Sequence, residues 1–121
     1  MTLSRQRVFK TKWFNKAAKA AGISDDDLRR AAKQLTQGMG DDLGGNVWKK
    51  RLDQNRKRGI VLNKVGHFWF FVFLFAKSDR ENIDDRELKA FRKLAADFCK
   101  LRRTEIDELV ALRELIEISH D

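Results

Sequence analysis

The apolar residues in the first third of the chain follow the spacing of one strand and two helices. Residues 7–10 are typical of a short strand, and the apolar residues after them recur every three or four positions. Gly22 ends the first helix, and Ser24 with the acids at 25–27 begins the second. We therefore predict a helix pair with buried faces formed by Trp13, Phe14, Ala17, Ala18 and Ala21 in the first helix, and by Leu28, Ala31, Ala32 and Leu35 in the second.

The middle of the chain changes from helical spacing to strand patterns. Four glycines between Gly38 and Gly45 interrupt any helical pattern, so we predict a flexible connector there. The third strand pattern is apolar on both faces, which is typical of a strand inside a sheet and covered on both sides. Strands are predicted at residues 47–52, 59–65 and 68–77, a helix at 85–101, and a last short helix marked by Ile106, Leu109, Val110 and Leu112 or Leu115.

These elements predict a single α+β domain over residues 1–121. A small antiparallel sheet would pack against an N-terminal helix pair and a C-terminal helix, in the order strand, two helices, three strands, helix. The chain of 121 residues contains no proline, no internal repeat and no low-complexity linker that would separate a second domain.

The charge of the chain indicates which class of partner it binds. Residues 1–77 hold 17 of the 26 basic side chains and only 6 of the 18 acidic ones, so the net charge of +8 is concentrated there. Such an excess is typical of proteins that bind nucleic acid or an acidic protein. The longest apolar run, Phe68 to Ala76, is too short to cross a membrane, and the single Cys99 suits a reducing compartment. We expect a cytoplasmic protein with no membrane partner.

The strand patterns predict that basic side chains gather at one end of the sheet. A two-residue turn at Gly66-His67 would pair Val65 with Phe68. This register gives the pairs Lys64–Trp69, Leu62–Phe71, Ile60–Phe73 and Arg58–Phe75. If Arg51 also pairs with Arg58, four cations lie on one face: Lys49, Arg51, Arg58 and Lys77.

The residue types available restrict the chemistry of such a site. The chain has no tyrosine, one cysteine and two histidines, His67 and His120, which are placed away from the predicted cations. We expect no metal and no cofactor, since no spaced set of ligands is present. Converging cations can instead stabilise the charge that develops when an RNA 2′-hydroxyl attacks its own phosphate, and a lysine of lowered pKa is a candidate base. Lys50 should point to the other face, and the loop residues Arg56 and Lys57 should help to hold a larger RNA surface.

Several stretches of the sequence resemble the RelE/HigB family of bacterial toxins. They are residues 8–14 (Val-Phe-Lys through Trp-Phe), 44–52 (Gly-Gly-Asn-Val-Trp-Lys-Lys-Arg-Leu), 73–77 (Phe-Leu-Phe-Ala-Lys) and 80–83 (Arg-Glu-Asn-Ile). The resemblance implies cleavage of messenger RNA in the ribosomal A site, leaving a 2′,3′-cyclic phosphate, and neutralisation by a co-expressed antitoxin. It assigns catalytic roles to Lys49, Arg51, Arg58 and Lys77, and makes Arg80 a looser candidate. Together with the basic residues Lys50, Arg56 and Lys57, Arg80 is a candidate for substrate binding.

The chain also departs from this family. Some members place a tyrosine or a histidine near the C-terminal end of the site, and neither stands near Lys77 here. The identity of the general base is therefore open. Residues 104–121 are expected to extend beyond the compact family core, either packing on the sheet or contacting the antitoxin.

Three functions from different classes remain open on the sequence. The grouped cations favour a ribosome-dependent messenger RNA endonuclease, whose partners would be the ribosome, messenger RNA and an antitoxin of the helix-turn-helix type. A ParE-like inhibitor of DNA gyrase would share the fold without needing these cations. An RNA-binding module without catalysis is the third possibility.

Overall fold

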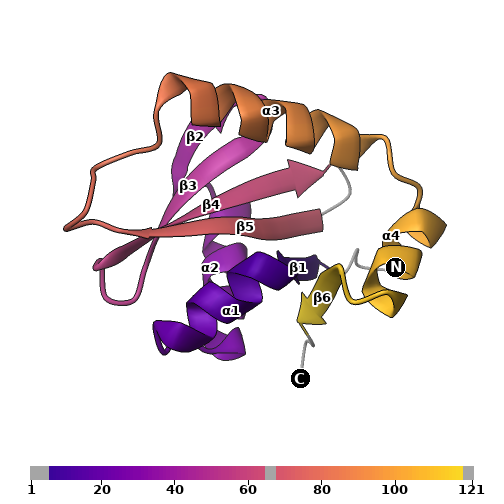
Figure 1. Ribbon diagram of the computed structural model, residues 1–121, viewed down its shortest axis with the longest axis horizontal. Coiled ribbons are helices and arrows are strands. Elements are labelled where there is room, and N and C mark those ends of the chain that lie inside the picture. Colours follow the sequence, from indigo (N-terminus) through magenta and orange to yellow (C-terminus); the bar gives the residue numbers. More distant parts are fainter. Residues whose placement is uncertain (1–5, 65–67, 119–121) are drawn as a thin grey trace.

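The computed structural model describes residues 6–64 and 68–118 (Figure 1). Helices and strands both occur, as the α+β prediction requires. Their bounds are β1 Arg7–Thr11, α1 Lys12–Ala20, α2 Asp25–Thr36, β2 Asp41–Gly44, β3 Val47–Leu52, β4 Lys57–Lys64, β5 Phe68–Ala76, α3 Asp85–Cys99, α4 Arg103–Ala111 and β6 Leu115–Ile118.

The strands form one six-stranded sheet in the order β2-β3-β4-β5-β1-β6. Strand β1 runs parallel to β5, and all other neighbours are antiparallel. The prediction of a purely antiparallel sheet was therefore wrong. The first strand does not continue a hairpin, because the chain crosses over through α1 and α2 and the strand inserts between β5 and β6.

Two strands were absent from the predicted element order. Strand β2 lies in the glycine-rich stretch and β6 near the end of the chain, so the prediction of a flexible connector was wrong for residues 41–44. Strand β2 is an exposed edge with one apolar residue, so its sequence carries no strand pattern. Pairing with β3 and two hydrogen bonds from Arg92 of α3 to the carbonyls of Leu43 and Gly44 hold it in place.

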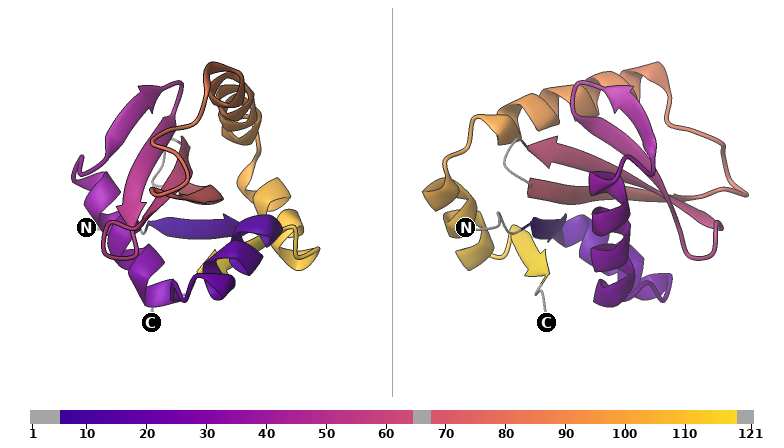
Figure 2. Two further views of the ribbon diagram at one scale, coloured as in Figure 1. Left: turned by 60° about the vertical axis from the view of Figure 1, so that its left-hand side comes forward. Right: turned by 180° about the vertical axis from the view of Figure 1, so that it is seen from behind.

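Helices cover both faces of the sheet. Figures 1 and 2 show α3 along one face, and α1 and α2 against the other. The α3 side packs around Phe9, Ile60, Leu62 and Phe70, and the opposite side around Phe14, Leu28, Leu35 and Phe71, all fully buried or nearly so. Strand β5 lies between β4 and β1 with both faces covered, which confirms the prediction from its apolar pattern.

The helix boundaries follow the predicted signals. Ser24 accepts a hydrogen bond from the Asp27 N–H, and the Asp27 side chain accepts one from the Ser24 N–H, which is a complete capping box. Gly22 follows the end of α1 with a φ of +73°, a value that glycine adopts without steric cost. Both features confirm the helix pair.

The register between β4 and β5 contains a bulge. Arg58 pairs with Phe75 and Ile60 with Phe73, as predicted, but Val61 pairs with Phe71. Strand β5 thus has one extra residue, Val72, and the pairs beyond it shift: Lys64 lies opposite Phe68 and Leu62 opposite Phe70. The predicted pairs Lys64–Trp69 and Leu62–Phe71 were wrong for this reason, and the predicted turn at Gly66-His67 lies outside the described residues. The bulge leaves the Arg58 end of the sheet in its predicted register.

The C-terminal segment is part of the sheet. Helix α4 ends at Ala111, Arg113 has a φ of +63°, and β6 then pairs with β1. Leu115 therefore belongs to a strand and not to the last helix. Among the helices of the described residues, none has the length and apolar character needed to cross a membrane.

Candidate functional site

The hairpin of β3 and β4 places two arginines side by side. Arg51 and Arg58 are directly opposite each other in the antiparallel pair, as predicted. Both point to the face that α3 covers further along the sheet, because they alternate with the same strand positions as Val47 and Ile60. Lys49, two residues before Arg51, shares this face.

Arg58 is held more firmly than Arg51. Only 8% of Arg58 is exposed, and its Nη1 donates hydrogen bonds to the carbonyls of Asn55 at 3.0 Å and Lys57 at 3.2 Å. Arg51 is exposed. Among the described residues, neither arginine has a carboxylate within ion-pair distance.

The loop that joins these strands has an uncommon backbone. Asp53, Gln54 and Asn55 all have positive φ values, of 52°, 52° and 71°. Arg56 forms an ion pair with Asp53 at 2.9 Å, and its N–H donates to the Asp53 carbonyl. Arg56 thus braces the loop that offers the Asn55 carbonyl to Arg58, and its Asp53 pair raises the pKa of its guanidinium.

Arg80 extends the row of cations across β5. The strand partner of Arg58 is Phe75, and the Arg80 guanidinium lies over the rings of Phe75, at 5.1 Å, and Phe73, at 5.5 Å. Glu87 in the first turn of α3 accepts two hydrogen bonds from Arg80, at 2.7 and 2.9 Å. The row therefore runs across three strands and a loop, from Arg51 on β3 through Arg58 on β4 and Phe75 on β5 to Arg80 after β5.

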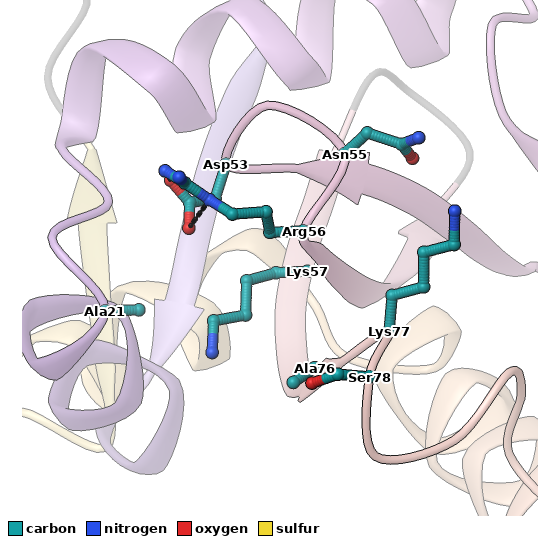
Figure 3. Close-up of a pocket in the computed structure, with 8 residues that line it drawn as sticks. All are labelled: Ala21, Asp53, Asn55, Arg56, Lys57, Ala76, Lys77 and Ser78. Carbon is teal, nitrogen blue, oxygen red and sulfur yellow. Dashed lines mark hydrogen bonds and ion pairs between the residues drawn. The ribbon is translucent and has the colours of Figure 1, made fainter.

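Lys57 and Lys77 line a pocket of about 750 Å³ at the tip of this hairpin (Figure 3). The N–H of Lys77 donates to the Arg56 carbonyl at 2.9 Å, so the end of β5 is fixed to the loop. Figure 3 shows the two lysine side chains pointing apart, Lys77 on the side of Asn55 and Lys57 toward Ala21. The structure thus brings Lys77 to the hairpin tip, while Lys57 lies on its other side.

Lys50 is not part of the cluster. It is 8% exposed and lies on the α2 face, and its Nζ donates to the Met39 carbonyl at 2.8 Å. Burial, and then the charge of Arg51, lower the pKa of Lys50. The pKa of a lysine is thus lowered at this hairpin, but on the face turned away from Arg58.

Two acidic residues of this region were missed by the sequence analysis. Asp41 of β2 lies 3.7 Å from the Nζ of Lys49, and Glu87 holds Arg80. Asp41 was hidden because its segment showed no strand pattern. Glu87 did have a signal, since Asp84 and Glu87 have the spacing of a capping box and form one.

The sequence of the chain matches the model of a known family over nearly its whole length. A sequence model of the RelE toxin of the RelE/RelB toxin–antitoxin system matches residues 6–118. The chain belongs to the RelE toxin family. The match to this family runs through α4 and β6, and it makes the chain a toxin of a toxin–antitoxin module with a cognate antitoxin as partner.

No curated protein and no solved structure matches the chain. The roles of individual residues in this RelE-family toxin therefore rest on its own geometry. The described part of the site offers guanidinium and ammonium groups, which bind phosphate, and the chain contains no tyrosine. Both histidines lie outside the described residues, so the predicted separation of His67 from the cations also lies outside them.

Proposed function

We propose that this toxin is an endoribonuclease that cuts messenger RNA on the ribosome. The observation that carries the proposal is the direct pairing of Arg51 with Arg58, with Lys49 on the same face. Like charges opposite each other destabilise a sheet by up to about 1 kcal/mol, so the fold gains no stability from this pair. A bound phosphate would turn the repulsion into an attraction.

The proposed reaction uses the nucleophile that RNA already carries. The 2′-oxygen loses its proton and forms a bond to the adjacent phosphorus, while the bond from phosphorus to the 5′-oxygen breaks and that oxygen takes up a proton. The products are a 2′,3′-cyclic phosphate and a 5′-hydroxyl. Arg58, fixed by two carbonyls, and Arg51 stabilise the negative charge on the phosphoryl oxygens, with Lys49 and Lys77 contributing from either side. We assign these four residues to charge stabilisation and not to proton transfer.

The remaining candidates take supporting roles. Arg56 shapes the loop through Asp53, and Lys57 is available to RNA at the pocket beyond the hairpin tip. Lys50 is tied to the Met39 carbonyl on the opposite face, so its contribution is to keep the β2–β3 edge in place. We expect the toxin to act in the cytoplasm, where ribosomes are, and its antitoxin to be a helix-turn-helix protein.

Expression of the toxin without its antitoxin tests this function. We expect messenger RNA to be cut at positions phased to codons, with 2′,3′-cyclic phosphates at the new 3′ ends, and much slower cutting by Arg51→Ala. Arg102→Ala is the matched control, because Arg102 is an exposed arginine directly before α4 and outside the site. Intact messenger RNA would overturn the proposal, and intact messenger RNA with DNA damage would indicate a gyrase inhibitor instead.

A further inference from the structure

Two of the five N–H donors of Arg80 are taken up by a carboxylate. Both terminal nitrogens, Nη1 and Nη2, donate to the two carboxylate oxygens of Glu87. A guanidinium binds phosphate through these same in-plane donors. The pKa of Arg80 is raised by this pairing and that of Glu87 is lowered, so both groups stay charged and paired.

Glu87 is itself fixed. Its Oε1 accepts a hydrogen bond from the Asp84 N–H at 2.9 Å, and its own N–H donates to Asp84 Oδ1 at 2.8 Å. The Arg80 N–H also donates to the Ala76 carbonyl at 3.3 Å. The guanidinium is therefore oriented from both ends, by the helix start and by the loop that leaves β5.

The guanidinium lies over two aromatic rings. Its centre lies 5.1 Å from the Phe75 ring and 5.5 Å from the Phe73 ring, while 35% of the side chain remains exposed. Glu87 and the two rings hold the guanidinium in one orientation, while part of it stays open to solvent and three of its five N–H donors are not used by Glu87. A flat, cationic face that is held in one orientation suits an aromatic base.

We propose that Arg80 is a stacking site for an RNA base beside the phosphate held at Arg58. Phe75 links the two positions, because it is the strand partner of Arg58 and lies under Arg80. The base would belong to a nucleotide that flanks the scissile phosphate. Glu87 is then a positioning residue, which keeps the guanidinium in its orientation and does not touch RNA. This inference rests on the proposed function in taking RNA as the ligand.

The charge of Arg80 and its flat shape can be separated by experiment. Arg80→Lys keeps the positive charge but removes the stacking plane. The probe is a short RNA with 2′-O-methyl riboses, which cannot be cut, together with copies in which one abasic nucleotide is moved along the strand. Binding is measured by fluorescence anisotropy for the wild type, Arg80→Lys, Glu87→Gln and the control Arg102→Lys.

The wild type should bind more weakly when one particular base is missing, by about 5- to 150-fold, because stacking of one base contributes about 1–3 kcal/mol. Arg80→Lys should bind all the RNAs with the affinity that the wild type shows for that abasic copy. Glu87→Gln should lose part of the preference, and Arg102→Lys should behave as the wild type does. A preference that survives in Arg80→Lys, or is absent from the wild type, overturns the inference.

These outcomes are distinct from a failure of the proposed function. If the wild type shows the base preference but leaves messenger RNA intact in cells, the stacking site stands and the endonuclease proposal falls. If messenger RNA is cut as expected and Arg80→Lys binds as the wild type does, only the stacking site is overturned. A wild type that binds none of the RNAs overturns the stacking site, while the endonuclease proposal still stands or falls with the cutting of messenger RNA in cells.

Discussion

Arg51 and Arg58 face each other across one strand pair, yet their surroundings differ. Arg58 is almost fully buried and holds two carbonyls of the hairpin loop, whereas Arg51 is exposed. Arg58 thus helps to stabilise the hairpin loop, and Arg51 does not. The proposed role in cleavage can therefore be tested separately from the role in stability by comparing variants at the two positions.

We predict that Arg51→Ala and Arg58→Ala each slow RNA cleavage by about 10²- to 10³-fold, the loss typical of one transition-state contact. Only Arg58→Ala should also lower the free energy of unfolding, by about 1–2 kcal/mol, because it leaves two partly buried carbonyls without a donor while relieving some repulsion. Cleavage rates and urea unfolding of both variants check this. A loss of stability in Arg51→Ala, or cleavage at the wild-type rate in either variant, would contradict it.

The pairing of these two arginines could be predicted from the sequence, since strand alternation and loop length alone determine it. The pairs Lys49–Asp41 and Arg80–Glu87 could not. Each joins the hairpin or β5 to an element whose place depends on the packing of the whole chain. The register that pairs Arg51 with Arg58 was therefore anticipated, and the carboxylates that pair with Lys49 and Arg80 were not.

At the scale of elements, the start of α3 connects the helix to the loop after β5. Glu87 both caps the helix, through Asp84, and holds Arg80. Its pKa is lowered, first by the hydrogen bond from Arg80 and then by that from the Asp84 N–H. A lowered pKa in the folded state means that the charged form of Glu87 stabilises the fold.

The sign of this linkage gives a pH prediction. The contribution of Glu87 is fully present above its ordinary pKa of 4.5 and is lost as the pH falls through the lowered, folded value. The difference in melting temperature between the wild type and Glu87→Gln should be largest near pH 7 and shrink below about pH 4.5. Thermal melts of both proteins between neutral and acidic pH measure it, and a difference that stays constant would refute the role of the carboxylate.

Elements with a strong periodic pattern were predictable, and elements that depend on their neighbours were not. Strand β5 and helices α1, α2 and α3 bury continuous apolar stripes, which the sequence displays. Strand β2 is an exposed edge, and β6 has four residues. Their strand structure comes from pairing with β3 and β1, which lie close by only after folding. The bulge at Val72 is likewise set by packing on both sides of β5.

At the scale of the whole molecule, the C-terminal strand completes the sheet. Leu115 is 2% exposed and packs in the core beneath α3 and α4, while Leu112, three residues earlier, is 71% exposed. Arg7 of β1 forms ion pairs with Glu117, at 2.8 Å, and Asp107, at 2.9 Å, so the two ends of the described chain are also joined by charge. Residues 104–118 are thus part of the fold.

We predict that Leu115→Ala lowers the free energy of unfolding by about 2–5 kcal/mol, because it leaves a cavity in the core. Leu112→Ala is the matched control and should change it by less than about 0.5 kcal/mol, as is usual for an exposed position. Urea unfolding of both variants measures the two values. Equal effects would mean that β6 does not close the sheet as described.

The position of β1 between β5 and β6 also has a consequence for the order in which the toxin can fold. Residues 7–11 leave the ribosome early, but their partners are residues 68–71 on one side and 115–118 on the other. The sheet cannot close until residues 115–118 have been made, and contacts so distant in sequence form slowly. The toxin therefore gains its complete sheet only after β6 has been synthesised.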